Sequence, residues 1–309
     1  IRDRSTLWTG ASITVYGTAV AALIEKALKI PTAPTNSSAT VEMTMLMLQG
    51  KSQLCNSNSP NAGYLLKNQA PWPADSSKIF RGITFGAYES QSQWFTRADS
   101  GINTFTDLKG KRVMCAREGE PAFEDVWRAV QAVYGVTFTA MPDLGIANQV
   151  TALKEGRADA GMCYGAAPVP GLVELQTTHP IRLISYTEAE LKAVFGKLDW
   201  VGQPFTIKAG TYKGQDKDVL ALMFNLGVSA RRDLPDDLVY AIAKAIDENI
   251  ADLRAVHPSF KTWTIKDLAN SPYAPYHAGA YKYYTEKGYL TPCLLYPSDA
   301  ADEEDSVDL

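Results

Sequence analysis

One pattern occurs twice along the chain and constrains its fold more than any other feature. Residues 39–59 (ATVEMTMLMLQGKSQLCNSNS) and 146–166 (IANQVTALKEGRADAGMCYGA) each predict a helix, a glycine stop, a polar pair, a short strand and a polar loop. The glycine stops are Gly50 and Gly156. Such a duplication predicts two lobes that share one architecture.

Each repeat is preceded by another loop and helix. Residues 9–30 predict an apolar helix with Ser12 and Thr14 as candidate N-terminal caps, and residues 117–136 predict a helix that begins near Pro121. Strands that alternate with helices favour an α/β fold, here two lobes that each hold a mainly parallel sheet flanked by helices. Ligands of such sheets bind at the carboxyl ends of the strands, so we expect a ligand cleft between the lobes.

The segments between these units give the expected lobe boundaries. Residues 91–100 predict a strand that runs into a turn, where the chain first crosses between lobes. Residues 220–253 predict an apolar strand, a turn and a long amphipathic helix, where it returns. We expect lobe 1 to contain residues 1–92 and 225–296, and lobe 2 to contain residues 93–224.

Composition and charge exclude several classes of protein. Hydrophobic residues make up 46% of the chain and charged residues 21%, which is typical of a soluble globular protein, and no apolar run is long enough for a membrane helix. No signal peptide is recognisable, so we expect that none was present or that it has been removed. Residues 297–309 hold six acidic residues and no basic one, which predicts a disordered acidic tail. The rest of the chain has no basic cluster for nucleic acid.

The cysteines and histidines argue against a structural zinc site. Cys55, Cys115, Cys163 and Cys293 form no Cys-x-x-Cys pair, and the chain has only three histidines. The first three cysteines end short predicted apolar strands, which favours buried free thiols. A disulfide between Cys115 and Cys163 is the alternative, and it requires Cα atoms within about 7 Å.

Motifs of catalysis are absent from the sequence. It contains no Gly-x-Ser-x-Gly, Walker or His-Glu-x-x-His pattern, and its histidines, at 179, 257 and 277, lie outside the predicted loops. Glu118 and Glu120 have three interpretations: they cap the helix near Pro121, they contact a ligand, or they form an acid–base pair. We expect no enzyme activity and no cofactor.

The predicted loops instead carry small polar and aromatic side chains, which bind ligands by hydrogen bonding and stacking. An ordinary turn or cap is the alternative role for each of them. Tyr16, Tyr88, Trp94 and Tyr164 could form an aromatic wall, although Trp94 could equally belong to a hinge core. The candidate ligand-binding residues are Ser12, Thr14, Tyr16, Ser37, Ser38, Asn56, Asn58, Tyr88, Glu118, Glu120, Ala122, Tyr164 and Gly165.

Five segments in order resemble one family. They are TRADSGINTFTDLKGKRV (96–113), TALKEGRADAGMCYGAAPVPGLVELQTT (151–178), IKAGTYKGQDKDV (207–219), VSARRDLPDDLVYAIAKAIDEN (228–249) and HAGAYKYYTEKG (277–288). Together they resemble the TAXI family, the solute-binding proteins of TRAP-type transporters. The resemblance implies a type II periplasmic-binding fold of the Venus-flytrap kind. It also implies a periplasmic, monomeric receptor that binds a small organic solute, a carboxylate or amino acid, and delivers it to the TRAP permease subunits, with no metal.

Three loops depart from the family pattern: GASITVYG, NSSATVE and REGEPAFED. The family's glycines are largely missing from them, although Tyr16 and Ser38 are kept. The added carboxylates of Glu118 and Glu120 would repel a second acidic group on a ligand unless Arg117 or Arg81 offsets them. They would suit a ligand with an ammonium group or hydroxyl donors. A sensory binding domain and an enzyme on the same fold are the alternative functions.

Overall fold

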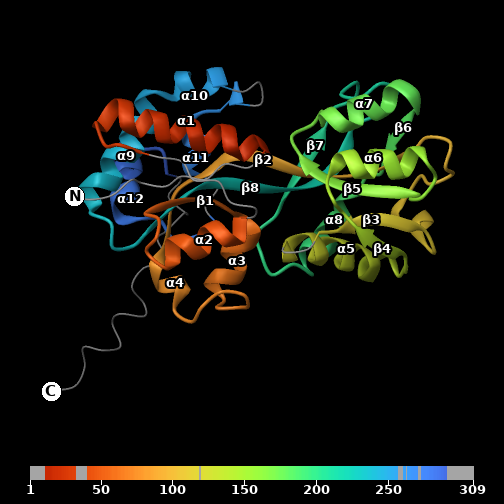
Figure 1. Ribbon diagram of the computed structural model, residues 1–309, viewed down its shortest axis with the longest axis horizontal. Helices are drawn as coiled ribbons and strands as arrows, with labels where there is room; N and C mark the ends of the chain where they lie inside the picture. Colours follow the sequence, from red (N-terminus) through yellow and green to blue (C-terminus); the bar gives the residue numbers. More distant parts are fainter. Residues whose placement is uncertain are drawn as a thin grey trace. The chain divides into compact units, whose positions relative to one another are not determined.

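The computed structural model describes residues 11–32, 40–117, 120–256, 260–261, 263–270 and 273–290. The chain divides into two compact units: unit 1, residues 1–88 with 225–309, and unit 2, residues 89–224. Two long strands, β2 (Phe80–Arg97) and β8 (Val219–Arg231), each run through both units (Figure 1).

Unit 1 surrounds its parts of β2 and β8 with helices (Figure 1). Its other elements are α1 (Ala11–Leu28), α2 (Thr40–Leu48), β1 (Leu54–Asn58), α3 (Ser59–Leu66), α4 (Ser76–Ile79), α9 (Asp236–Glu248), α10 (Ile250–Val256), α11 (Ile265–Ala269) and α12 (Ala278–Glu286). Helix α9 contacts α12 and α1, α1 also contacts α10, and α2 and α3 contact β1. The C-terminal helix α12 therefore packs on α9 within unit 1.

The core of unit 1 is rich in tyrosines whose hydroxyls are bonded. Tyr16 of α1 is fully buried and shares a 3.0 Å hydrogen bond with Thr84 of β2. Its ring meets Phe260 and Trp263 edge-on, at centroid distances of 6.1 and 5.6 Å. Tyr284 of α12 donates to the carbonyl of Ile83 at 3.0 Å. These bonds satisfy polar groups that would otherwise be costly to bury.

Unit 2 carries the remaining elements. They are η1 (Phe105–Leu108), β3 (Arg112–Ala116), α5 (Pro121–Tyr134), β4 (Thr139–Pro142), α6 (Ile146–Lys154), β5 (Ala160–Gly165), α7 (Pro170–Thr178), β6 (Ile181–Leu183), α8 (Glu188–Phe195) and β7 (Gln203–Ile207). In Figure 1, α6 and α7 cover one face of its strands, and α5 and α8 cover the other.

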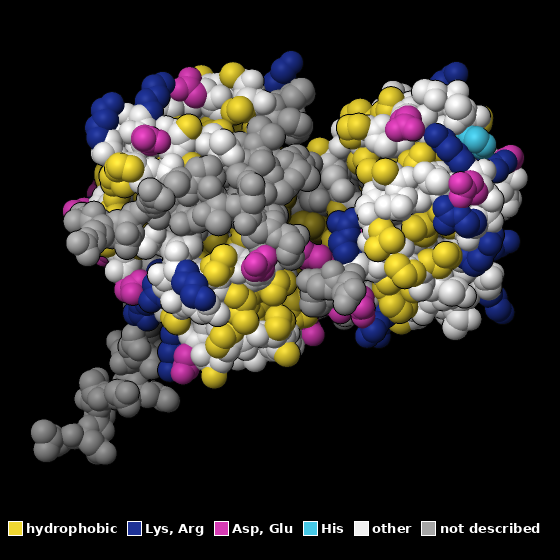
Figure 2. Space-filling model, in the orientation of Figure 1, with side chains coloured by type: hydrophobic (Ala, Val, Ile, Leu, Met, Phe, Trp, Pro, Cys, Tyr) yellow, Lys and Arg dark blue, Asp and Glu magenta, His cyan; other side chains and the backbone are white. Residues whose placement is uncertain are grey.

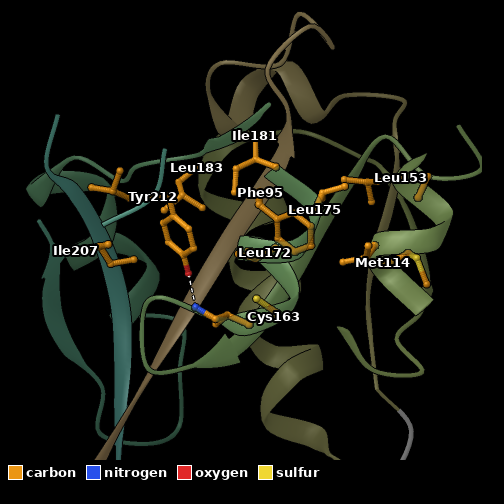
Figure 3. Close-up of a cluster of buried hydrophobic side chains, with 14 of the residues drawn as sticks. Phe95, Met114, Leu153, Cys163, Leu172, Leu175, Ile181, Leu183, Ile207 and Tyr212 are labelled. Atoms are coloured by element: carbon orange, nitrogen blue, oxygen red, sulfur yellow. Dashed lines mark hydrogen bonds between the residues drawn. The ribbon is translucent and has the colours of Figure 1, made fainter. Parts of the chain in front are cut away.

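An apolar cluster joins α6 and α7 to the strands of unit 2. Phe95, Leu172, Leu175 and Ile181 lie at its centre and are all less than a tenth exposed (Figure 3). Burying a side chain of this size contributes about 1.5–3 kcal/mol, so the cluster fixes these helices on the sheet.

The strands are ordered β1-β8-β2-β5-β3-β4, with β6 beside β2 and β7 beside β8. Strand β3 is parallel to β4 and β5, whereas β1–β8, β2–β5, β2–β6 and β7–β8 are antiparallel. The fold is mixed α/β, and the expectation of mainly parallel sheets is wrong for the described pairs. The long strands β2 and β8 cause the difference, because they contribute every antiparallel pair.

The repeated helix–glycine–strand pattern is confirmed in both places. Gly50 follows α2 with φ 73°, and Gly156 follows α6 with φ 67°, the left-handed backbone that glycine adopts without strain. The strands are longer than predicted, because β1 continues through Asn58 and β5 through Gly165. Their cysteines therefore lie inside the strands rather than at the ends.

Three cysteines, Cys55, Cys115 and Cys163, are buried and free, as the first interpretation predicted. Strands β3 and β5 are neighbours, but the alternative disulfide between Cys115 and Cys163 does not form. Cys293 and the acidic tail lie outside the described residues. Among the helices that are described, none is long and apolar enough to cross a membrane. Charged side chains of both signs are interspersed with apolar ones on the face shown in Figure 2.

Candidate functional site

The carboxyl ends of three strands meet at one edge of unit 2. Strand β3 runs parallel to β4, with Val113 opposite Ala140, and parallel to β5, with Met114 opposite Gly161. The segments that follow these strands therefore start at the same edge, where α/β sheets usually bind ligands. We call the residues at this edge the strand-end surface: Arg117, Phe123, Asp143, Tyr164 and Phe224.

An ion pair fixes the cation of the strand-end surface. Arg117 follows β3, and its Nη2 lies 2.5 Å from Oδ2 of Asp143, which follows β4. The Asp143 carboxylate has no exposed surface, and its Oδ1 accepts a 2.8 Å hydrogen bond from the Gly145 N–H. The guanidinium also lies 4.5 Å from the ring centroid of Phe123, which is a cation–π contact. Arg117 nevertheless remains 36% exposed.

Helix α5 points its N-terminus at the same edge. Pro121 occupies its first turn, as predicted, and Glu120 occupies the N-cap position. Glu120 makes no side-chain cap hydrogen bond, so the predicted capping role is wrong for this residue. Ala122 is buried in the first turn, and Glu118 lies outside the described residues. The positive end of the helix dipole thus faces this edge without a side-chain cap.

Aromatic rings line the rest of the strand-end surface. The ring centroid of Tyr164 lies 4.3 Å from that of Phe123 and 5.0 Å from that of Phe224. Trp200 meets Phe224 edge-on at 6.1 Å. The hydroxyl of Tyr164 is buried without a hydrogen-bond partner, and burial raises the pKa of this phenol well above its ordinary value. The exposed part of Tyr164 is therefore not its hydroxyl group.

A buried polar network holds the loop that follows β5. Gln93 of β2 donates from Nε2 to the carbonyl of Gly165 at 2.9 Å and accepts from the Tyr212 hydroxyl at 2.5 Å. The Val169 N–H donates to the same hydroxyl at 2.7 Å (Figure 3). Gln91 accepts from the Ala167 N–H at 2.8 Å. Gln91 and Gln93 thus hold residues 165–167 directly, and Tyr212 links Gln93 to Val169, so the backbone at Gly165 has a fixed position.

In unit 1, the polar residues of β1 hold the fold together. Ser57 shares hydrogen bonds with Ser229 of β8 at 2.6 Å and with Tyr273 at 2.9 Å. Asn58 caps α3 by accepting from the Asn61 N–H at 2.8 Å. Asn56 is fully buried in the same strand. The prediction of a polar loop over residues 56–59 is therefore wrong, because the hydroxyl and amide partners allow a polar strand to be buried.

Besides Asn56 and Asn58 of β1, the predicted binding residues lie in several different places. Glu120, Ala122, Tyr164 and Gly165 lie together at the carboxyl ends of the unit 2 strands. Ser12, Thr14 and Tyr16 lie within α1 rather than on a loop, and Tyr16 is part of the core. Tyr88 lies in β2. Ser37, Ser38 and Glu118 lie outside the described residues, and so do the side chains of Ser12, Thr14 and Tyr88.

Sequence reasoning missed Asp143, Phe123 and Phe224, and it treated Arg117 only as a charge that offsets acids. The positions of Arg117 and Asp143 gave a signal that could have been used. Each of these residues comes directly after a strand. Trp94, by contrast, is core, with its ring 5.4 Å from Phe105.

The described residues offer little for acid–base or metal chemistry at this edge. No cluster of three histidine, cysteine, aspartate or glutamate side chains that could hold a metal occurs in the described ranges. Of the histidines that are described, His179 follows α7 and His277 caps α12, so both lie on other elements. The strand-end surface therefore combines a fixed cation with ring faces, which suits binding of a small molecule.

Comparison with known proteins places the chain in a family. The NMT1-like family profile matches residues 8–288. The chain belongs to the NMT1-like family. Solved structures with the same fold include a TctC solute-binding protein from Polaromonas, with a TM-score of 0.53 and 17% identity over 82% of this chain and 86% of that one.

Two further solved structures share this fold. A periplasmic transporter protein has a TM-score of 0.52 and 13% identity over 93% of both chains. Malate-bound MatC from Rhodopseudomonas palustris has a TM-score of 0.51 and 15% identity over 83% of this chain and 88% of that one. At these identities the likeness shows the fold, which is that of the type II periplasmic binding proteins.

Proposed function

We propose that this NMT1-like protein is a periplasmic receptor of the TAXI type. It captures a small organic solute, a carboxylate or an amino acid, and delivers it to a TRAP-type transporter. The family match over residues 8–288 and the type II fold support the receptor function. The five collinear TAXI-like segments support the TRAP partner.

The strand-end surface of unit 2 is the observation that carries this proposal. It places a half-exposed guanidinium, an uncapped helix N-terminus and the rings of Phe123 and Tyr164 at the edge where α/β folds bind ligands. We propose that Arg117, Glu120, Ala122, Tyr164 and Gly165 contact the solute. Such contacts bind a molecule reversibly and leave it unchanged.

A thermal-shift screen tests the receptor function. The purified protein is heated with amino acids, dicarboxylates and aromatic carboxylates in turn. A ligand at about 100 times its Kd adds about 2.7 kcal/mol of stability, which raises Tm by several degrees in a chain of this size. NMR of the recovered solute distinguishes a receptor, which returns it unchanged, from an enzyme.

Transport in proteoliposomes tests the partner. Uptake of the identified solute by the permease subunits is measured with and without this protein. We expect uptake only when the receptor is present. A folded protein that binds its solute but does not stimulate uptake would leave a sensory domain as the better function.

A further inference from the structure

The charges of the strand-end surface can accept one carboxylate. Asp143 contacts a single guanidinium nitrogen of Arg117, and a guanidinium has five N–H donors in a planar fork. Because the carboxylate of Asp143 is fully buried and also bonded to Gly145, the guanidinium is held in one orientation. A cation fixed in this way loses little side-chain entropy when it binds an anion.

A second acidic group would meet repulsion at the same edge. Asp143 already neutralises the charge of Arg117. Glu120 adds a second acidic residue beside it, because the Glu120 N–H donates to the Arg117 carbonyl at 3.2 Å. The surroundings of Arg117 are therefore acidic, and they disfavour a ligand with two negative charges.

The remainder of the strand-end surface is apolar. The ring of Tyr164 packs against those of Phe123 and Phe224, which are buried at 5% and 7% exposure. Tyr164 itself is partly exposed and its hydroxyl is buried, so it presents no hydroxyl to a ligand. Leu144, in the loop next to Asp143, is 74% exposed and extends the apolar character of this edge. Ring faces of this kind bind a planar or branched hydrocarbon group.

Resting on the proposed receptor function, we infer that Arg117 anchors the carboxylate of a monocarboxylate whose body is aromatic or branched and lies against Tyr164. Dicarboxylates are excluded by the acidic surroundings. Asp143 is a positioning residue, because it acts on the ligand through Arg117.

Isothermal titration with matched probes tests the ligand class. The probes are phenylacetate, its amide phenylacetamide, phenethylamine and succinate, followed by branched aliphatic monocarboxylates. We expect a monocarboxylate to bind, and the matching amide to bind about tenfold to hundredfold more weakly, because the charge-assisted hydrogen bonds are lost. Succinate is expected to bind more weakly than the best monocarboxylate.

Variants of the ion pair test the anchor. Arg117→Gln is expected to weaken carboxylate binding by the same factor and to leave the weak binding of the amide unchanged. Because this substitution leaves the Asp143 carboxylate buried without its cation, the double variant R117Q/D143N serves as a folded comparison with two neutral amides. It should show the same loss of binding with the stability restored. Arg128→Gln is the control, because Arg128 is an exposed residue of α5 that pairs with Glu124.

Native mass spectrometry of protein purified without added ligand separates the two proposals. If an amine or a dicarboxylate binds best, or if R117Q/D143N binds carboxylates normally, the receptor function stands and the monocarboxylate inference is overturned. If no probe binds and a co-purified solute is seen, a carboxylate that R117Q/D143N fails to retain supports the inference, and any other solute overturns it. If no probe binds and no solute co-purifies, both proposals are overturned.

Discussion

Replacing Gly227 with alanine is expected to destabilise unit 1 more than a surface substitution would. Gly227 lies in β8, and a Cβ atom at this position would stand 1.9 Å from the Thr84 carbonyl oxygen of β2. Cβ atoms in real structures stay at least about 3.0 Å from other heavy atoms, so the two strands would have to separate by about 1.1 Å. The obstacle is backbone, so no side-chain rotation relieves it.

The cost follows from the bonds that end at Thr84. The Val228 N–H donates to its hydroxyl at 3.1 Å, and the Tyr16 hydroxyl shares a 3.0 Å bond with it. A separation of about 1.1 Å takes the Val228 bond, which joins the two strands, past the range of a hydrogen bond. Each buried polar group left unpaired costs about 1–3 kcal/mol, so the two groups of this bond cost about 2–6 kcal/mol.

Urea unfolding of G227A at 25 °C measures this loss. Gly196→Ala is the matched control, because Gly196 is exposed, has the helical φ of −65°, and its Cβ would lie 3.4 Å from the nearest atom. We expect G196A to change stability by less than about 1 kcal/mol, in the stabilising direction. A folded G227A that loses less than about 1 kcal/mol with an unchanged m-value would show that the strands separate without breaking these bonds.

Two further predictions concern buried polar groups. The His277 side chain caps α12 and is only 1% exposed, and burial lowers its pKa. The unfolded chain therefore binds the proton more readily than the folded one, so the folded protein loses stability as pH falls below about 6.5. His277→Asn keeps a cap acceptor, and its urea midpoint should therefore fall less between about pH 7.5 and about pH 5.5 than that of the unaltered protein; equal slopes would contradict this. Tyr212→Phe leaves Gln93 and the Val169 N–H without their shared hydroxyl, which should cost about 2–4 kcal/mol in the same assay. A loss near zero would mean that water replaces the hydroxyl.

The local elements of the fold were predictable because their signals are local. The helix-to-strand turns at Gly50 and Gly156 require a left-handed backbone, and helix α5 begins with proline and ends at Gly135. These features depend on residues within one turn of each other, and the sequence displays them directly. The pairing of strands is different, because nothing within β1 specifies that its partner is β8.

Burial of polar residues was the main source of error. Residues 56–58 are polar and were predicted as a loop, yet they lie inside the buried strand β1, and the polar residues 90–93 of β2 are buried as well. Their partners, such as Ser229 and Tyr212, are far away in the sequence. The ion pair of the strand-end surface was not predicted for the same reason: Arg117 and Asp143 become a pair only when β3 and β4 align in parallel.

The pairing of β1 with β8 also sets the order of events during synthesis. Leu54 lies opposite Ala230, so the partner strand emerges from the ribosome 176 residues later, roughly 9–35 s at about 5–20 residues per second. Until then the first 88 residues cannot complete their sheet, whereas residues 89–224 are one continuous segment and can fold as they appear. For the periplasmic receptor proposed above, a first unit that cannot complete its sheet early keeps the nascent chain unfolded and accessible to chaperones and to the export machinery.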